Sequence, residues 1–126
     1  MGKIVKLTIP FIPPTINKYI GRSNIWEYQA DKKKIHNAVR LTTIGKRYNI
    51  EKCKMTIIYY FKDKRRHDPS NYDKMILDGL VEANIIIDDN YGVINEFTTI
   101  GKYDKTNPRT EVIIEELWEK NLLIKY

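Results

Sequence analysis

Residues 53–84 read CKMTIIYYFKDKRRHDPSNYDKMILDGLVEAN, and this stretch carries two hydrophobic periods in succession. From Cys53 to Phe61 the apolar side chains favour alternate positions, which predicts a strand whose odd-numbered residues face the core. From Tyr72 to Asn84 the apolar residues recur at helical spacing, which predicts a helix with one buried side. That side consists of Ile76, Leu77, Leu80, Val81 and Ala83.

The two ends of this helix have recognisable signals. Ser70 followed by Asp73 matches a capping box, so we expect Ser70 to be the N-cap and Asp73 to face back toward it. Asn84 is a residue type that tolerates the left-handed conformation, and it is expected to stop the helix.

The flanking sequence predicts further elements on both sides. Upstream, we expect a strand from Ile4 to Ile9 and a helix from Ile25 to Thr43. Downstream, we expect a short buried strand, two longer strands forming a closing hairpin around a loop, and an apolar tail. These are Ile85 to Ile87, Val93 to Tyr103, the loop 104–108, Thr110 to Glu116, and Leu117 to Tyr126. The tail closes the core or docks a second subunit.

The order of the elements predicts the fold class. Strands, then a helix, then strands again favour an α+β fold with a mixed sheet of about four strands packed on two main helices. A length of 126 residues accommodates one core of ordinary size, so we expect a single domain over residues 1–126.

Composition narrows the class of protein. The chain is 42% hydrophobic and 30% charged, which is typical of a soluble globular protein, and no apolar run is long enough to span a membrane. The opening MGKIVKLTIPFIPP becomes polar and proline-rich too early for a secretory signal. One cysteine, Cys53, has no partner for an internal disulfide, and a cytoplasmic location is expected.

The charge balance favours a polyanionic partner. Lys and Arg number 22 against 16 Asp and Glu, giving a net charge of +6. Nucleic acid is one reading of this excess, and a basic surface that keeps the protein soluble is the other. One basic cluster, from Lys62 to Arg66, runs directly into acidic residues.

Those acidic residues can be brought together by the predicted elements. Pro69 forces Asp68 into an extended conformation ahead of the helix. The helix extends about 20 Å and the following residues can return about 16 Å, so Asp89 can end near Asp68. Lys74 lies in the first helical turn beside both.

This group has the composition of a divalent-metal site. Mg²⁺ prefers hard oxygen ligands and commonly uses one or two carboxylates with water and phosphate oxygens. Lys74 would add a charge for the transition state, and the neighbouring Arg65 and Arg66 would hold flanking phosphates.

Structural explanations of the same residues remain open. Asp68 can favour a helix N-terminus, Asp88 and Asp89 can be turn residues, and Lys74 with Asp78 can be a helical ion pair. A partly exposed structural role fits His67 better than a general base, and strand and helix packing fits Tyr59, Tyr60 and Tyr72 better than base stacking.

Over most of its length the chain resembles the RusA-type Holliday-junction resolvases, small endodeoxyribonucleases of phages and prophages. The resemblance includes IPFIPPTIN at residues 9–17 and D-x-S-N-x-x-K from Asp68 to Lys74, where the family typically has D-x-D-N-x-x-K. It continues through the apolar helix, the Asp88-Asp89 pair and the closing strands.

The resemblance implies roles for individual residues. Asp68, Lys74 and Asp89 would be catalytic, with Asp68, Asp89 and Asp88 as metal ligands and Mg²⁺ (or Mn²⁺ in its place) as cofactor. Asn71 would belong to the motif, with Asp73 in support. Ser70 stands where the family has a second Asp, so the metal would be held with one charge less; Asp73, Asp88 or water could compensate.

The resemblance also implies a partner and an oligomeric state. The family is homodimeric, and a two-fold dimer matches the two-fold symmetry of a four-way DNA junction cut by paired nicks. Candidate DNA-binding residues are Lys62, Lys64, Arg65, Arg66, Asn17, Lys102, Lys105 and Arg109. Three readings compete with a resolvase acting in recombination, repair or phage DNA processing. The first is a nuclease of the same chemistry that cuts other branched or flapped DNA. The second is a branched-DNA-binding protein with a metal site weakened by Ser70, and the third is a basic interaction domain of a phage replication module.

Overall fold

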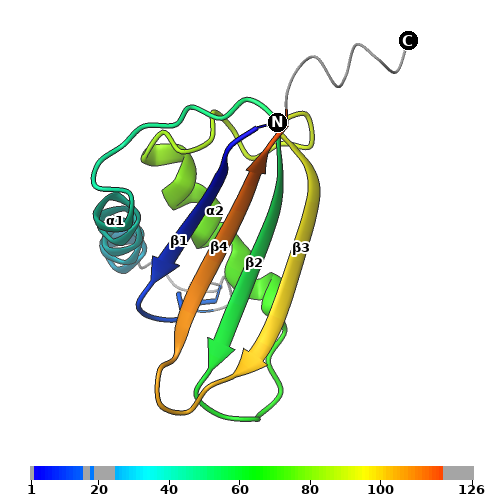
Figure 1. Cartoon of the computed structure of the whole chain (residues 1–126). Helices are drawn as coiled ribbons and strands as arrows, with labels where there is room; N and C mark the ends of the chain where they lie inside the picture. The colour runs from blue at the N-terminus through cyan, green and yellow to red at the C-terminus, as the bar shows by residue number, and fades with distance from the viewer. Residues whose placement is uncertain (1, 16–17, 19–24, 118–126) are drawn as a thin grey trace.

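The fold is a mixed sheet with two helices on one face. A computed structural model describes residues 2–15, 18 and 25–117. Within these residues the strands are β1 (Ile4–Ile9), β2 (Cys53–Phe61), β3 (Ile94–Tyr103) and β4 (Arg109–Glu116), in the order β1-β4-β2-β3 (Figure 1). The helices are α1 (Ile25–Thr42) and α2 (Asp73–Glu82), and a short 3₁₀ helix, η2 (Pro69–Tyr72), precedes α2. The expected α+β class is confirmed.

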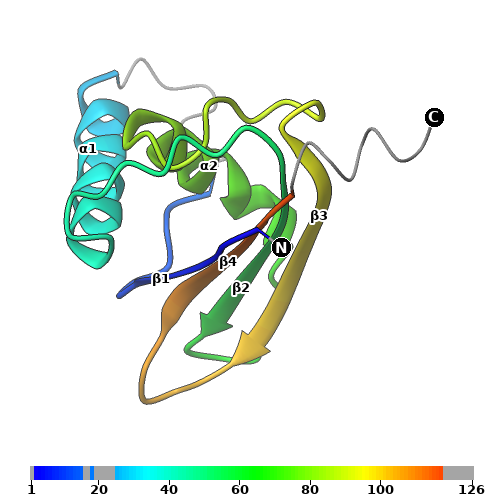
Figure 2. The same cartoon turned by 45° about the horizontal axis from the view of Figure 1, so that its top comes forward.

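Alternation in the strands creates the core. In β1 every second residue is buried, and in β2 the odd-numbered residues Cys53, Met55, Ile57 and Tyr59 are fully buried. Both helices lie on the same side of the sheet, as Figure 2 shows. Alternate positions of β1, such as Ile4, face away from this core and are exposed. None of the helices among the described residues is long and apolar enough to cross a membrane.

The expected hairpin between the last two strands is wrong. β4 lies between β1 and β2 and is antiparallel to both, whereas β3 lies at the edge and pairs with β2 in parallel. Burial explains this order, because β4 places Val112 and Ile114 fully in the core while β3 buries only Ile94 along its length. The loop 104–108 therefore passes the end of β2, where Asp104 N–H donates to the Phe61 carbonyl at 2.8 Å.

The helix start also differs from the expectation. Ser70 is not an N-cap; it lies inside η2, and the residue that caps α2 is Tyr72, without a side-chain hydrogen bond. The physical reason is Pro69, whose fixed φ suits the first position of a helical turn, so the turn starts before Ser70. At the other end the helix stops as expected, with Asn84 at φ 60°.

The segment after the helix forms less sheet than expected. Residues 85–87 make one parallel bridge, between Ile50 and Ile86, rather than a strand of their own. Ile85 and Ile86 are buried as expected, but Ile87 is about half exposed. Of the apolar tail, Leu117 donates its N–H to the Lys52 carbonyl, and the remaining residues, including Trp118 and Leu122, lie outside the described residues.

A close approach between β3 and η2 fixes the start of the helical region. A Cβ placed on Gly101 would lie 3.2 Å from Pro69 Cγ and 3.3 Å from the Phe61 ring. A side chain at this position would require Pro69 and the Phe61 ring to move by a few tenths of an ångström, so Gly101 favours the close approach of η2 to the strand.

We predict that Gly101→Val lowers the free energy of unfolding by about 1–3 kcal/mol, because Pro69 and Phe61 would have to move apart. Thr98→Val, at an exposed position of the same strand, is the matched control and should change it by less than about 0.5 kcal/mol. Urea unfolding of both variants measures the difference, and equal stabilities would contradict the proposed contact.

Candidate active site

The segment between β2 and η2 is held by contacts of His67. Its ring stacks on Phe61, with centroids 4.0 Å apart and the planes within 6° of parallel. Its Nε2 lies 2.8 Å from Asp63 Oδ1, and its Nδ1 lies 3.3 Å from the Tyr72 hydroxyl. The hydrogen bond with His67 lowers the pKa of Asp63 to about 2, with further lowering from Arg65. These contacts fix the path of the chain just before Asp68.

Asp68 is extended and points toward solvent. Its φ of −103° and ψ of 99° are the extended values that the following proline requires. The side chain is 56% exposed, and its nearest cation is Arg66, with Nε 3.7 Å from Asp68 Oδ1. The carboxylate thus lies within the basic cluster and is accessible to a ligand.

Asp73 takes the opposite position and is buried in the core. Its Oδ1 accepts a 2.6 Å hydrogen bond from the Tyr59 hydroxyl, and its Oδ2 accepts a 2.9 Å bond from Thr99 Oγ1. Burial raises the pKa of Asp73, although both hydrogen bonds act in the other direction. Both carboxylate oxygens are therefore engaged inside the protein. Asp73 does not reach back to Ser70, which is the second way in which the expected capping box fails.

Lys74 follows directly and projects outward from α2. Its ammonium group lies 3.3 Å from Asp78 Oδ1, so the helical ion pair considered from the sequence is present. Asp78 Oδ2 in turn accepts a 3.1 Å hydrogen bond from the Tyr28 hydroxyl of α1. The hydrogen bond and charge of Asp78 raise the pKa of Lys74, and the charge of Asp89 adds to this shift. Lys74 is therefore cationic and lies within electrostatic reach of Asp89.

The two adjacent aspartates behave differently. Asp88 accepts hydrogen bonds from the Asp89 backbone N–H at 2.7 Å and from the Asn90 side-chain amide at 3.1 Å, as a turn residue does. Asp89 is half-buried, and its carboxylate makes no side-chain hydrogen bond to any of the described residues.

Asp68 and Asp89 are held by contacts at distant points of β3. Pro69 packs on Gly101, whereas Asn90 accepts the backbone N–H of Ile94 at 2.9 Å. Those two positions of the strand are seven residues apart, about 23 Å in extended chain. The described part of the chain contains no group of three or more acidic, histidine or cysteine side chains placed to hold a metal. The oxygen donors suit a hard cation in kind, but they do not form a closed cluster within one protomer.

The candidate DNA-binding residues gather at one end of the sheet. β2 and β3 both finish there and β4 begins there, at the lower end in Figure 1. Lys62, Lys64, Arg65 and Arg66 follow β2, and Lys102 and Lys105 lie near the end of β3. The Lys64 ammonium lies 5.0 Å from the centre of the Tyr103 ring and that of Lys102 5.9 Å from Tyr60, which ties the two groups together.

Two of the candidate residues need separate comment. Arg109 is 19% exposed and bonded to Asp104 and Glu111 at 2.9 Å each, with its guanidinium 3.7 Å from the centre of the Tyr60 ring. It is therefore committed to internal partners at the start of β4. Asn17 lies outside the described residues.

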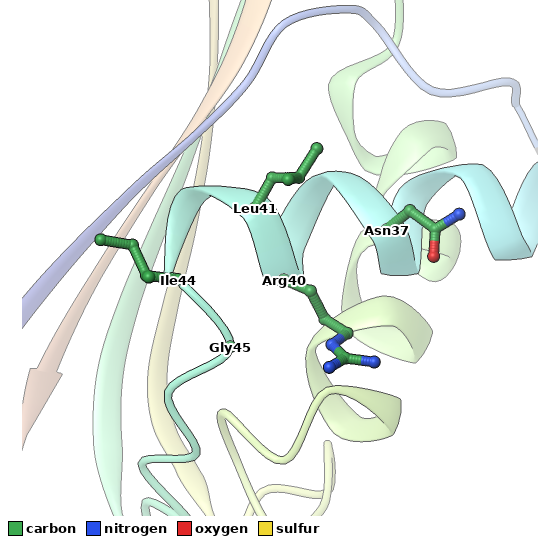
Figure 3. A pocket seen from close by; sticks show the side chains of 5 residues that line it. All are labelled: Asn37, Arg40, Leu41, Ile44 and Gly45. Atoms are coloured by element: carbon green, nitrogen blue, oxygen red, sulfur yellow. The ribbon is translucent and has the colours of Figure 1, made fainter.

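A cavity of about 650 Å³ lies away from these residues, at the C-terminal end of α1 (Figure 3). Its lining consists of Asn37, Arg40, Leu41, Ile44 and Gly45. These side chains offer one cation and no carboxylate, so the cavity has no chemistry for metal binding and does not belong to the candidate site.

We predict that Asp73→Asn changes the pH dependence of stability. Burial raises the pKa of Asp73 in the folded protein above the unfolded value of about 3.9. The contribution of Asp73 to the free energy of unfolding is therefore complete below about pH 4, and it is lost as the pH rises through the folded-state pKa. Asparagine keeps an acceptor for Tyr59 and does not ionise, so the stability of the variant relative to the wild type should increase from pH of about 4 toward 7. Urea unfolding across that range measures it.

Asp104→Asn is the matched control with the opposite sign. The hydrogen bond from Arg109 lowers the pKa of Asp104, so the wild type gains stability from this group as the pH rises. The free energy of unfolding of the Asp73→Asn variant and of the wild type is compared at each pH from about 4 to 7. If the difference between the two stays constant, the burial of a titrating carboxyl group at position 73 is contradicted.

Comparison with known proteins identifies the family of the chain. Residues 8–115 match the protein family described as Endodeoxyribonuclease RusA, and this region runs from β1 into β4 and contains every candidate residue from Lys62 to Arg109. No curated protein matches the chain. The family match covers most of the 126 residues, and it assigns a DNA-hydrolysing activity to a fold with exposed carboxylates beside a basic end. The chain therefore belongs to the RusA endodeoxyribonuclease family.

Proposed function

We propose that the protein is a divalent-metal-dependent, structure-selective endodeoxyribonuclease that resolves four-way DNA junctions by paired nicks. The observation that carries the proposal is an exposed carboxylate, Asp68, within a basic cluster, in a member of a DNA-cleaving family. A protein that only binds DNA gains nothing from an acidic group at the centre of its phosphate-binding surface, since the carboxylate repels the ligand.

We propose Asp68 and Asp89 as the metal-binding carboxylates, with Mg²⁺ as the expected ion and Mn²⁺ as a substitute. Because the two do not form a closed cluster within one protomer, an ion bound to both would have to be held between the protomers of the homodimer. We propose Asp89 as the better ligand of the adjacent pair, because its carboxylate has no side-chain hydrogen bond among the residues that the structure describes, whereas both oxygens of Asp88 are used by the turn. A bound divalent ion supplies an activated water and neutralises charge on the scissile phosphate. Asp73 does not compensate for Ser70, because both of its oxygens are engaged by Tyr59 and Thr99.

The remaining residues of the site bind and orient the DNA. We expect Lys74 to stabilise negative charge on the leaving oxygen, which the 3.3 Å contact with Asp78 supports by orienting its ammonium group. Lys62, Lys64, Arg65 and Arg66 hold phosphates on either side of the cleavage point and carry no base specificity themselves. We expect the active form to be a homodimer, which would place one site on each of two opposed strands of a junction, in recombination, repair or phage DNA processing.

The second candidate function is junction binding without cleavage. It is favoured by Ser70, a neutral residue at the position where the family typically supplies a second carboxylate, and Ser70 is exposed on η2, where a carboxylate would fit. Under this reading the wild type would bind a junction without cutting it even in Mn²⁺, and Ser70→Asp would restore cleavage.

We predict that Asp89→Asn reduces the rate of junction cleavage about a hundredfold or more while preserving or tightening binding, because one ligand is lost and one repulsive charge is removed. Asp88→Asn is the matched control and should retain most of the activity. Single-turnover cleavage and gel-shift binding, both with a labelled four-way junction, measure the two quantities. Equal cleavage by the Asp89→Asn variant and the wild type would overturn the assignment.

A further inference from the structure

A second hollow, of about 440 Å³, lies at the basic end of the sheet. Among the described residues, four segments that are distant in the sequence border it: residues 10–12 after β1, residues within 61–67 after β2, Tyr72 in η2, and Pro108 before β4. It lies next to the candidate active site, because His67 lines it and the next residue is Asp68. The Tyr72 ring belongs to the same group of contacts, with its hydroxyl 3.3 Å from His67 Nδ1.

The walls of this hollow are mainly aromatic and apolar. Phe11, Phe61 and Tyr72 contribute rings, and Pro10, Ile12 and Pro108 complete the apolar lining. Phe61 and Tyr72 are held in place by ring packing. Phe61 is 6% exposed and packs against both the His67 ring, at 4.0 Å, and the Tyr72 ring, at 5.3 Å. Flat, fixed aromatic walls are suited to a flat aromatic ligand.

The polar groups of the hollow exclude an anion from its interior. Asp63, the carboxylate in the lining, already accepts bonds from His67 and from the backbone and guanidinium N–H groups of Arg65. The Arg65 guanidinium is in turn held by Asp63 at 3.3 Å. A phosphate deep inside would meet aromatic rings and the Asp63 carboxylate, whereas a neutral ring would meet favourable surfaces.

Cations stand at the solvent side of the same hollow. Lys62 is exposed and the Arg65 side chain is 80% exposed, and both belong to the lining. On the α1 side, the Lys34 ammonium lies 4.6 Å from the centre of the Phe11 ring. The ligand that matches this arrangement is a neutral planar ring flanked by negative charges, which is the chemistry of a nucleobase between two phosphates.

We propose that this aromatic pocket, lined by Phe11, Phe61 and Tyr72, receives one unstacked nucleobase from the branch point of the DNA substrate. The volume is within the range of small-ligand pockets and accommodates a single base. Lys62 and Arg65 hold the phosphates on either side of that base. Its position beside Asp68 places the neighbouring phosphodiester of the strand at the candidate active site.

The pocket gives a physical basis for selecting branched over linear DNA. Extracting a base from an intact duplex costs stacking and pairing energy, and the cost is smallest where the base is already unpaired or poorly stacked. A branch point offers such a base and a continuous duplex does not. All four bases can stack on aromatic side chains, so the pocket would select DNA by its branched structure and not by its base sequence. This inference rests on the proposed function, since it names how the same site recognises its substrate.

A double-mutant cycle between protein and DNA tests the proposal. Binding is measured by fluorescence anisotropy in chelator, so that cleavage plays no part, using a four-way junction with natural nucleotides and the same junction with abasic sites at the branch. Wild-type protein should bind the abasic junction about tenfold more weakly. Phe11→Ala should bind both junctions equally, at the weaker affinity, because the stacking surface is missing.

Two further variants keep the test decisive. Phe11→Leu preserves apolar volume and removes only the flat ring, so it should show the same loss of coupling even if Phe11→Ala folds poorly. Trp26→Ala removes an aromatic side chain that is 84% exposed on α1 and should keep the wild-type tenfold difference. Junction binding with no difference between natural and abasic branches in the wild type would overturn the pocket and leave the proposed function standing. Failure to prefer any junction over linear duplex would overturn both.

Discussion

The contact on which the candidate site depends is the buried carboxylate of Asp73. It accepts one hydrogen bond from Tyr59 on β2 and one from Thr99 on β3, and thereby ties the first turn of α2 to two strands. Its neighbours are oriented by this contact. With Asp73 turned inward, the next residue on the helix, Lys74, is turned outward toward Asp78 and the charge of Asp89. Five residues earlier, Asp68 is exposed among cations.

The contact also explains how the protein combines a rigid framework with an open acidic surface. An aspartate in the core is costly unless both oxygens are hydrogen-bonded, and here both are. Pro69 against Gly101 adds a second, apolar attachment of η2 to β3. The residues between these two attachments, Ser70 to Tyr72, include two positions of the D-x-S-N-x-x-K pattern, Ser70 and Asn71. Chemistry at the surface is thus supported by packing that the solvent does not reach.

Much of this fold could be predicted from the sequence, because strand and helix periods are local properties. The alternation in residues 53–61 and the stop at Asn84 were sufficient to give β2 its bounds and α2 its end. The pairing of β4 between β1 and β2 could not be read in the same way, since it depends on the competing burial of whole strands. Ser70 was wrongly predicted as the N-cap of the helix, because Pro69 starts the helical turn one residue earlier. The role of Asp73 was predicted wrongly, because an aspartate in a capping box and a buried aspartate cannot be told apart by their position in the sequence. The Tyr59 hydroxyl was an indirect signal, since a buried hydroxyl group needs a hydrogen-bond acceptor.

The electrostatic arrangement connects the fold to its substrate. Parallel pairing of β2 and β3 brings their ends together, so basic residues from two separate parts of the chain form one end of the molecule. Asp68 and the aromatic pocket lie beside them.

We propose above all that the protein cuts branched DNA with a metal ion bound by Asp68 and Asp89. The most direct test is cleavage of a synthetic four-way junction in Mg²⁺ and in chelator, against a linear duplex of the same sequence. The account predicts symmetric nicks in the junction that require the metal and do not occur in the duplex. Tight junction binding without nicks in either Mg²⁺ or Mn²⁺, or equal cleavage of the duplex, would contradict it.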